Sequence, residues 1–310
     1  MSKLNMSQTF IDIDNIKYYT PEKINSFFFG VERNNYLIIS VIQQNFELFK
    51  FLLTQKKAEA NYINENGYSV LNFILLKKLW KYFSFLFNLP ENEQIDTPKK
   101  IYNSLNRMKS YNKSDIKNNK NELTYPGAAL SIINNLSKMH NNLLAISIDE
   151  LNDINILKSL LILYDNHINF FVINQEKDLL NNPEKYKQEQ DKILLKFVNE
   201  VFNMEYSKTK ETLLIKCIKQ NNLEMFKFLL NEINFNNTSI KLNIHKTDCN
   251  GQNVLHHAVK LKQKESILYL VNYDADYDIL INKKDIKRNT PKDLDKTKSF
   301  ENELYTIWDA

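Results

Sequence analysis

The sequence predicts an all-α fold in which short helical hairpins stack side by side, and three observations support this prediction. Glycine and proline are scarce, with 4 and 6 among 310 residues, which disfavours a turn-rich β fold. Apolar residues recur at spacings of one, three and four in 254–259 and again in 267–271, as in two short amphipathic helices. The polar run 260–266 is only long enough to reverse the chain between them. The third observation is that this hairpin has copies.

The copies of the hairpin lie at fixed offsets along the chain. Residues 64–71 match residues 248–255 at a constant offset of 184, with Gly67, Val70 and Leu71 on Gly251, Val254 and Leu255. Residues 47–53 superpose without a gap on residues 224–230. One hairpin of this size cannot bury both of its apolar stripes, so we expect the copies to stack on one another.

At these residues the chain resembles the ankyrin-repeat family, whose unit reads D-x-x-G-x-T-P-L-H-x-A-A, a helix reversal, a second helix and the turn G-A-D. The matching residues are Asp248, Gly251, Leu255, His256, Ala258, Ala275 and Asp276. Another unit begins 37 residues on, at Asp285, Thr290 and Pro291. The resemblance implies an ankyrin-type solenoid of about seven repeats with short hairpin turns.

The repeats depart from the family pattern at two places. The Thr-Pro pair becomes Ser69-Val70 or Asn253-Val254. The glycine of the helix reversal is replaced by Gln44, Lys78, Asn221 or Lys262. Asparagine tolerates a positive φ, whereas lysine is less comfortable there, so we expect slightly irregular repeats.

The N-terminal residues 1–30 are predicted to precede the repeats as a segment with a capping helix. Residues 1–19 have an extended or loosely ordered pattern, and Thr20-Pro21-Glu22 is a helix start with threonine as the N-cap. We expect this helix to run through Phe29 and to stop at Gly30. Its apolar cluster, Ile24, Phe27 and Phe28, would cover the first repeat.

Residues 31–310 are predicted to form one solenoid, with a polar basic insertion near 110–121 and a weak repeat register at 165–209. A third unit is expected to start at Thr97-Pro98, and helices to resume near Pro126. The other expected units are 34–61, 64–89, 141–164, one from 210 with a long hairpin at 231–247, 248–276, and a terminal cap at 285–310 containing Leu304, Ile307 and Trp308. In 141–164 the helix reversal has about one extra residue compared with the family.

Charge and composition narrow the classes of partner and compartment. The formal net charge is +4, from 41 basic and 37 acidic residues, without the concentrated basic face of nucleic-acid-binding proteins. No stretch approaches the roughly 20 apolar residues of a membrane span, so membrane insertion is not expected. The basic tract 99–120 could touch acidic tails, membranes or RNA, but a solvated loop is favoured. The two cysteines fall in different repeats and indicate a reducing, intracellular and cytoplasmic location.

Neither metal-binding nor catalytic chemistry is indicated by the spacing of the polar residues. His245, Cys249, His256 and His257 lie close in sequence, but their spacing fits no standard zinc site, and His256 is at the family's own histidine position. The alternating Asp274, Asp276 and Asp278 lack the glycine and glutamate of an EF-hand loop, so a solvated turn is favoured. We expect no catalytic residues, no metal and no cofactor.

The resemblance implies that one or more protein partners bind along a concave side, at hairpin tips and exposed positions of the first helices. Carried over position by position, the candidate residues are Glu65, Asn66, Tyr68, Lys77, Lys219, Gln220, Cys249, Asn250, Gln252 and Lys260. Tyr68 is the best candidate for an anchor, because tyrosine buries a large area at low entropic cost.

The predicted function is therefore a non-enzymatic protein–protein interaction scaffold or adaptor, without a small-molecule substrate. Membership of a large cytoskeletal or ciliary assembly is one version of this prediction. The alternatives are a regulatory subunit or divergent enzyme with a site in 90–205, and an effector exported into a host cell.

Overall fold

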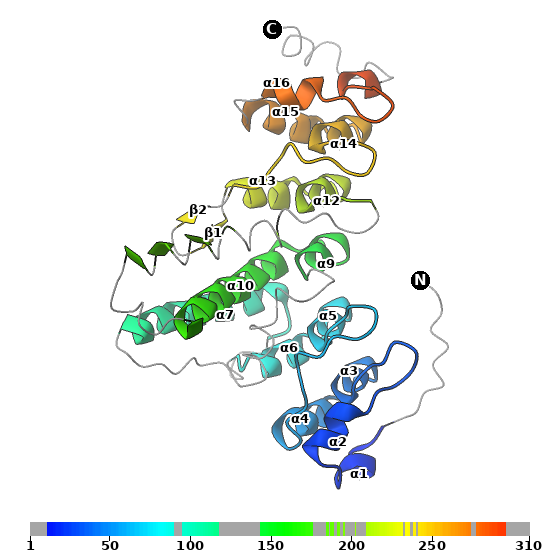
Figure 1. The fold of residues 1–310 in the computed structure, drawn as a ribbon, viewed down its shortest axis with the longest axis vertical. Helices are drawn as coiled ribbons and strands as arrows, with labels where there is room; N and C mark the ends of the chain where they lie inside the picture. Colours follow the sequence, from blue (N-terminus) through cyan, green and yellow to red (C-terminus); the bar gives the residue numbers. More distant parts are fainter. Residues whose placement is uncertain are drawn as a thin grey trace. The chain divides into compact units, whose positions relative to one another are not determined.

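The computed structural model describes residues 11–89, 95–117, 143–175, 209–231, 233–235, 238–239, 241–273 and 277–295, with isolated positions between 184 and 202. These residues are helical (Figure 1), apart from turns and the antiparallel two-residue strands β1 (Asn234–Phe235) and β2 (Thr238–Ser239). Contacts divide the chain into two compact units, Met1–Tyr186 and Lys187–Ala310. The continuity of one solenoid from 31 to 310 stays a prediction.

The first unit begins with two short helices followed by two helical hairpins. Its helices are α1 (Ile13–Ile16), α2 (Pro21–Ser26), α3 (Tyr36–Ile42), α4 (Phe46–Thr54), α5 (Val70–Leu76), α6 (Trp80–Leu86), α7 (Pro98–Lys117), α9 (Leu143–Asp149) and α10 (Ile154–Gln175). The hairpins α3/α4 and α5/α6 lie where the sequence predicts the units 34–61 and 64–89. We call the two helices of a hairpin its first and second helix. Leu37 and Leu71 occupy the same position in the first helices α3 and α5, and both are completely buried.

The N-terminal segment differs in part from its prediction. The Thr20 hydroxyl accepts the N–H of Lys23 at 3.3 Å, which confirms the predicted start of α2. The helix ends at Ser26 rather than Phe29, because Phe29 pairs with Asn34 in a short hairpin whose turn contains Gly30 at φ +69°. The extended conformation expected before residue 20 is wrong for α1, and residues 1–10 lie outside the described part.

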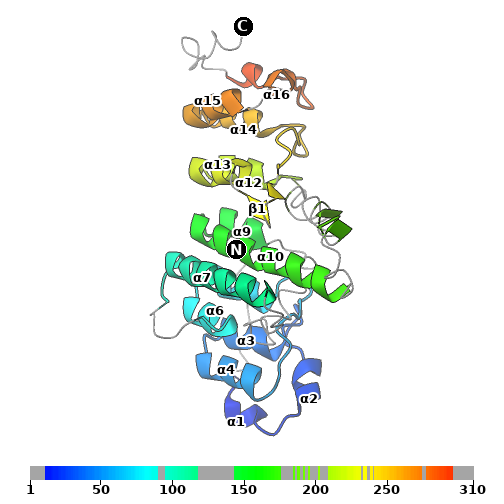
Figure 2. The same cartoon turned by 90° about the vertical axis from the view of Figure 1, so that its left-hand side faces the viewer.

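Helix α7 is the main departure in the first unit. It continues through Lys117, so the exposed insertion predicted from residue 110 is helical as far as the structure describes it. First helices α3, α5 and α9 contact one another in turn, whereas α7 contacts α6 and α10 (Figures 1 and 2). It therefore lies in the layer of second helices, and the predicted third unit does not start there with a first helix. The helices expected near Pro126 fall outside the described residues.

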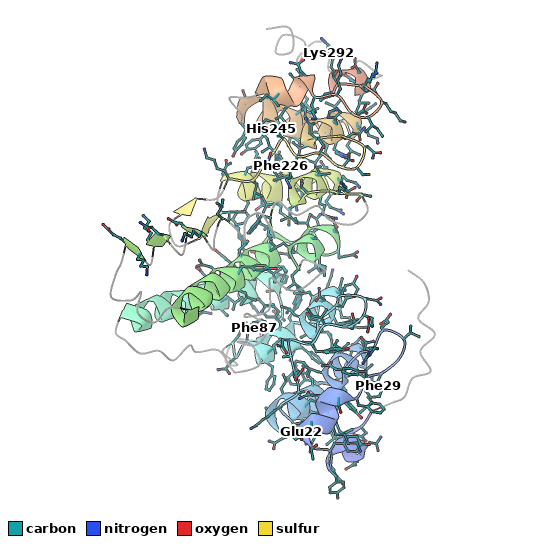
Figure 3. All side chains as sticks on the ribbon, in the orientation of Figure 1. Glu22, Phe29, Phe87, Phe226, His245 and Lys292 are labelled. Atoms are coloured by element: carbon teal, nitrogen blue, oxygen red, sulfur yellow. The ribbon has the colours of Figure 1, made fainter. Side chains whose placement is uncertain are left out.

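The second unit contains two complete hairpins and the start of a further repeat. Its elements are α12 (Leu213–Lys219), α13 (Leu223–Asn231), α14 (Val254–Lys260), α15 (Lys264–Tyr273), α16 (Tyr277–Asn282) and the 3-10 helix η4 (Lys292–Leu294). Helix α12 packs on α14, and Phe226 of α13 (Figure 3) is buried with its ring centroid 6.2 Å from that of Tyr269 in α15. Cys217 is buried. Helix α16 was not predicted, and the end of the predicted cap at 296–310 lies outside the described residues.

The helix reversals confirm the predicted left-handed position. Gln44, Lys78, Asn221 and Lys262 have φ values of 55°, 55°, 53° and 57°. Each donates its backbone N–H to the carbonyl three residues earlier at 2.9 to 3.1 Å. Lysine therefore adopts the same geometry as asparagine, and the irregularity expected at this turn is absent from these four reversals. Between α9 and α10 the reversal has the one extra residue that the sequence predicts.

Candidate protein-binding surface

The turns at Asn64, Asp248 and Asp285 each lie before the first helix of a repeat and have the same pattern of hydrogen bonds. The Oδ1 atom of Asp248 accepts the backbone N–H groups of residues 250 and 252 at 2.8 and 2.9 Å. Asn64 accepts those of residues 66 and 68 at 3.1 and 2.8 Å, and Asp285 accepts those of residues 287 and 289 at 2.9 Å each. A side chain that binds its own backbone two and four residues on fixes a tight turn without help from solvent. We call these turns the hairpin tips.

Neighbouring hairpin tips are joined by hydrogen bonds. In the second unit, the N–H of Ile286 donates to the carbonyl oxygen of Asn250 at 2.9 Å, and the side-chain amide of Gln252 donates to Asp285 Oδ2 at 3.1 Å. In the first unit, the N–H of Glu65 donates to the carbonyl oxygen of Glu32, in the turn between Phe29 and Asn34, at 3.0 Å. The tips are therefore held in position before any partner arrives.

Helix α14 is fixed to α16 and to the tip at Asp285 by hydrogen bonds. Asn253, at the Thr position of the family pattern, accepts the N–H of His256 at 3.0 Å and donates its amide to the Leu280 carbonyl at 3.0 Å. The Nε2 atom of His256 lies 3.2 Å from the carbonyl oxygen of Asn289, to which it donates in the Nε2–H tautomer. His256 thus has the structural role that the resemblance implies.

The two adjacent histidines are buried groups whose pKa values are lowered. Burial lowers the pKa of His256 below its ordinary value, and burial also lowers that of His257 although the Asp248 carboxylate, 3.2 Å from its Nε2, acts in the opposite direction. Across the part of the chain that the structure describes, no three His, Cys, Asp or Glu side chains gather as metal ligands would.

A groove of about 530 Å³ lies between the last two hairpin tips, the end of α14 and η4. We call it the hairpin groove. It is lined by Asn250, Gln252, Lys260, Asp285, Ile286, Lys287, Asn289, Asp293 and Leu294. Three of the predicted partner-binding residues, Asn250, Gln252 and Lys260, are among them. The lysines at 260 and 287 are exposed, and Ile286 is 68% exposed, so the groove has both charged and apolar surface.

Gln252 differs from the other predicted residues in the second unit. It is only 8% exposed, because its amide is bound to Asp285, so it supports the groove wall and offers little side chain to a partner. Lys219, Gln220 and Cys249 are exposed. Lys219 is the last residue of α12, and its ammonium is 2.8 Å from a carboxylate oxygen of Glu211.

The remaining predicted residues lie in the first unit. Glu65 and Asn66 are exposed on a hairpin tip, and Lys77 is exposed at the end of α5. Tyr68 is half-buried, with its ring centroid 5.8 Å from that of Phe73. The two units thus hold two separate groups of predicted residues, each on hairpin tips and first-helix ends.

The sequence reasoning missed the groove residues contributed by the last tip. Asp285, Ile286, Lys287 and Asn289 repeat the positions of Asp248, Cys249, Asn250 and Gln252 at an offset of 37. Carrying the candidate positions over by this offset, from one repeat to the next, would have found them.

The comparisons with known proteins identify one family. The model for ankyrin repeats in three copies matches residues 185–282, a range that contains α12 to α16 and the tip at Asp248. A search of the curated proteins finds no match. Within the described residues, no helix combines the length and the apolar character that crossing a membrane requires. Ankyrin repeats are protein-interaction modules and are typically non-catalytic. The match confirms the resemblance read from the sequence over residues 185–282, and the count of about seven repeats stays a prediction.

Proposed function

This chain carries ankyrin repeats at residues 185–282, and on that premise we propose that it is a non-enzymatic scaffold or adaptor that binds a partner protein in the hairpin groove. The observation that carries the proposal is the convergence of Asn250, Gln252 and Lys260 on one groove in the repeat region. The candidate positions in the first unit form a separate group, with Tyr68 as its anchor.

The construction of the groove supports binding without rearrangement. Asp248 and Asp285 hold both tips through backbone hydrogen bonds, and two further hydrogen bonds join tip to tip. Binding therefore orders little of the chain. Less of the free energy gained from the contacts is then lost to ordering than for a flexible loop, so binding is tighter.

The chemistry of the groove indicates where the partner makes contact. The Asp285 carboxylate is occupied by its own turn and by Gln252, and Asp293 accepts the N–H and hydroxyl of Thr290 at 2.7 and 2.8 Å. The exposed ammonium groups of Lys260 and Lys287 remain available at the rim as contacts for a partner. Because such rim charges mainly steer association, we expect the apolar Ile286 to supply much of the affinity.

The proposed setting is the interior of the cell. Both cysteines are free thiols, with Cys217 buried and Cys249 exposed, which supports a reducing compartment. The scaffold would act there as an adaptor for a transient partner or as a fixed part of a larger assembly, such as a cytoskeletal or ciliary one.

The proposal is tested by affinity capture from the native cell, with bound proteins quantified by mass spectrometry. The intact chain is compared with a variant carrying Asn250→Ala, Lys260→Glu and Lys287→Glu. A control with the same change of charge carries Lys227→Glu and Lys264→Glu, at exposed positions of α13 and α15 outside the groove. We expect a stoichiometric partner that the groove variant loses and the control keeps.

Two outcomes would contradict the proposal. A partner retained equally by the groove variant would show that the binding surface lies elsewhere, and the Tyr68→Ala, Lys77→Glu variant would then test the first unit. If no protein is captured by the intact chain, the scaffold role is wrong.

A further inference from the structure

Three exposed lysines of the second unit follow one another from repeat to repeat. Lys219 and Lys260 are the last residues of α12 and α14, two first helices that pack on each other. Lys260 also lines the hairpin groove together with Lys287, which lies on the last tip. All three lie well inside stretches that the structure describes. We call Lys219, Lys260 and Lys287 the basic row.

The carboxylates at the start of these repeats are buried and already bound. Asp248 and Asp285 accept the N–H groups of their own turns. Glu211, just before α12, is also buried and lies between two lysines, with the ammonium groups of Lys219 at 2.8 Å and of Lys216 at 3.9 Å. Because one carboxylate faces two ammonium groups, this end of the row keeps an excess of positive charge.

Asp293 is an exposed carboxylate that lines the hairpin groove, and its charge is offset locally. It accepts the N–H and the hydroxyl of Thr290 at 2.7 and 2.8 Å. These hydrogen bonds, together with the charges of Lys284 and Lys292, hold the pKa of Asp293 below its ordinary value. Two lysines near one carboxylate leave this end of the groove positive as well. Among the described residues, the surface along the basic row is therefore positive.

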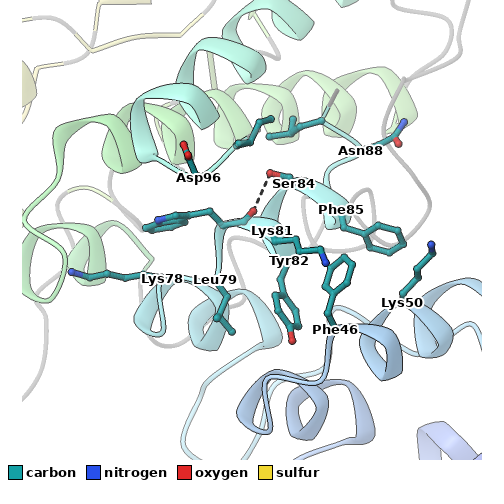
Figure 4. Close-up of a pocket in the computed structure, with 13 residues that line it drawn as sticks. Phe46, Lys50, Lys78, Leu79, Lys81, Tyr82, Ser84, Phe85, Asn88 and Asp96 are labelled. Atoms are coloured by element: carbon teal, nitrogen blue, oxygen red, sulfur yellow. Dashed lines mark hydrogen bonds between the residues drawn. The ribbon is translucent and has the colours of Figure 1, made fainter. Parts of the chain in front are cut away.

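The basic row is not a requirement of the repeat itself. At the offsets that relate the first helices, the lysines that end α12 and α14 are replaced by the half-buried Ile42 and Leu76 in α3 and α5. The lysine of the last tip is replaced by Asn66. A lysine of the first unit such as Lys81 lies on a second helix instead, with its ammonium 3.9 Å from the centre of the Phe46 ring (Figure 4). The row thus serves a purpose other than stacking, which supports a role in binding.

The stack sets the spacing of the charges in the row. Packed helices lie about 8–10 Å apart, so the ends of α12 and α14 hold their lysines at roughly that separation. An extended segment of the polyproline-II type has three residues per turn and rises about 3.1 Å per residue. Its side chains at positions i and i+3 therefore point to the same side, roughly 9 Å apart. Such a segment matches the row when every third residue is acidic.

From this geometry we propose that the partner segment bound at the hairpin groove is acidic and extended, with carboxylates about three residues apart that meet Lys219 and Lys260, and a further carboxylate that meets Lys287. The proposal rests on the proposed function, since the segment belongs to the same partner. Leu261 and Ile286 are exposed apolar neighbours of the lysines. Apolar residues among the carboxylates of the segment would contact them.

A nucleic acid also carries regularly spaced negative charges, but this surface lacks the side chains that hold bases. Phenylalanine, tyrosine and tryptophan are absent from the described tips and first helices of the second unit, in 209–220, 248–261 and 285–294. Proteins that bind single strands stack the bases on such rings. The repeats are also of a family of protein-interaction modules. A peptide segment is therefore the ligand that the surface fits.

The test is a selection of random short peptides displayed on yeast against the intact chain at low salt, followed by fluorescence titration of the selected peptides. We expect the selected peptides to be enriched in aspartate and glutamate at a spacing of three. A synthetic peptide with the same residues but adjacent carboxylates should bind about threefold more weakly or worse, as for loss of one exposed ion pair. Added salt should weaken binding, because the lysines are exposed.

Substitutions in the row and a matched control locate the site. Lys219→Gln with Lys260→Gln should lower peptide affinity about fivefold or more and remove the preference for spaced carboxylates, since two ion pairs are lost. Lys287→Gln should lower affinity by a smaller factor. Lys227→Gln with Lys264→Gln makes the same change of charge on the second helices and should leave affinity unchanged. Thermal unfolding confirms that each variant remains folded.

Several outcomes would overturn the proposal. These are selection of basic or uncharged peptides, selection of no peptide, equal affinity for spaced and adjacent carboxylates, and tighter binding of an RNA oligonucleotide of random sequence. The scaffold role fails separately. If acidic peptides bind the row but no protein is captured from the cell, the scaffold role is wrong. If a captured partner is lost in the groove variant but acidic peptides do not bind, the groove stands and the acidic segment is wrong.

Discussion

The backbone N–H of Ile286 donates to the carbonyl oxygen of Asn250 at 2.9 Å and so joins two consecutive hairpin tips. The equivalent bond in the first unit runs from Glu65 to Glu32 at 3.0 Å. Each of the three hairpin tips is shaped by its own Asx side chain, and the tips at Asn64 and Asp285 are also held by the turn that precedes them in the stack. The shape of the hairpin groove therefore depends on contacts between repeats, and substitutions at these contacts should change stability in predictable ways.

Gly251→Ala should destabilise the second unit by about 1–3 kcal/mol, because residue 251 has φ +74° and an added Cβ would lie 3.2 Å from the Ile286 nitrogen. Gly30→Ala is the matched control: it has φ +69° but nothing within 4 Å of its Cβ, so it measures backbone strain alone. Urea unfolding, followed by hydrogen exchange in each unit, gives both values. An equal or smaller loss for Gly251→Ala would contradict the tip-to-tip contact.

Asn253→Ala should lower the free energy of unfolding by about 1–2 kcal/mol, since it removes the N-cap of α14 and the bond to the Leu280 carbonyl. Asn253→Ser keeps a capping oxygen but cannot reach residue 280, so an intermediate loss is expected. Equilibrium denaturation ranks the unchanged protein, Asn253→Ser and Asn253→Ala by their free energies of unfolding. If serine matched asparagine, the link to Leu280 would contribute nothing.

Lys262→Gly should stabilise the protein by up to about 1 kcal/mol, because glycine removes the strain of φ +57° at the reversal between α14 and α15. Lys227→Gly, in the middle of α13, should instead destabilise it by about 1 kcal/mol through loss of helix propensity. Thermal denaturation of both variants checks the opposite signs. A destabilising Lys262→Gly would mean that the lysine side chain itself supports the reversal.

The second unit should lose stability as the pH falls below about 6.5. Burial lowers the pKa values of His256 and His257 in the folded unit, so the unfolded chain binds protons at higher pH than the folded one. The contribution of the two rings is complete above the unfolded pKa and disappears as the pH drops through the folded values. The His257→Gln variant should show a shallower loss in urea titrations across this range. An unchanged pH profile would rule out His257 as a contributor.

The local turns of the fold could be predicted from the sequence because their causes are local. Gln44, Lys78, Asn221 and Lys262 stand where the family has glycine, and all have a positive φ. Thr20 and Pro21 likewise start α2 at the predicted residue. A backbone conformation set within one turn leaves its mark on a short window of residues.

Features that depend on distant contacts could not be predicted in the same way. The polar tract after residue 110 has a loop-like composition, yet α7 continues through it, beside α10. Gln252 has the pattern of an exposed position, but its partner Asp285 lies 33 residues further on and buries it.

The most direct test of the scaffold account is photo-crosslinking in living cells, with a benzophenone amino acid placed at position 250 or 287 in the hairpin groove. The same residue at position 265, on α15, is the control, because Glu265 is exposed and does not line the groove. The account predicts one dominant protein adduct, shared by positions 250 and 287 and absent from position 265. Adducts of equal yield at all three positions, or none at 250 and 287, would contradict binding in the groove.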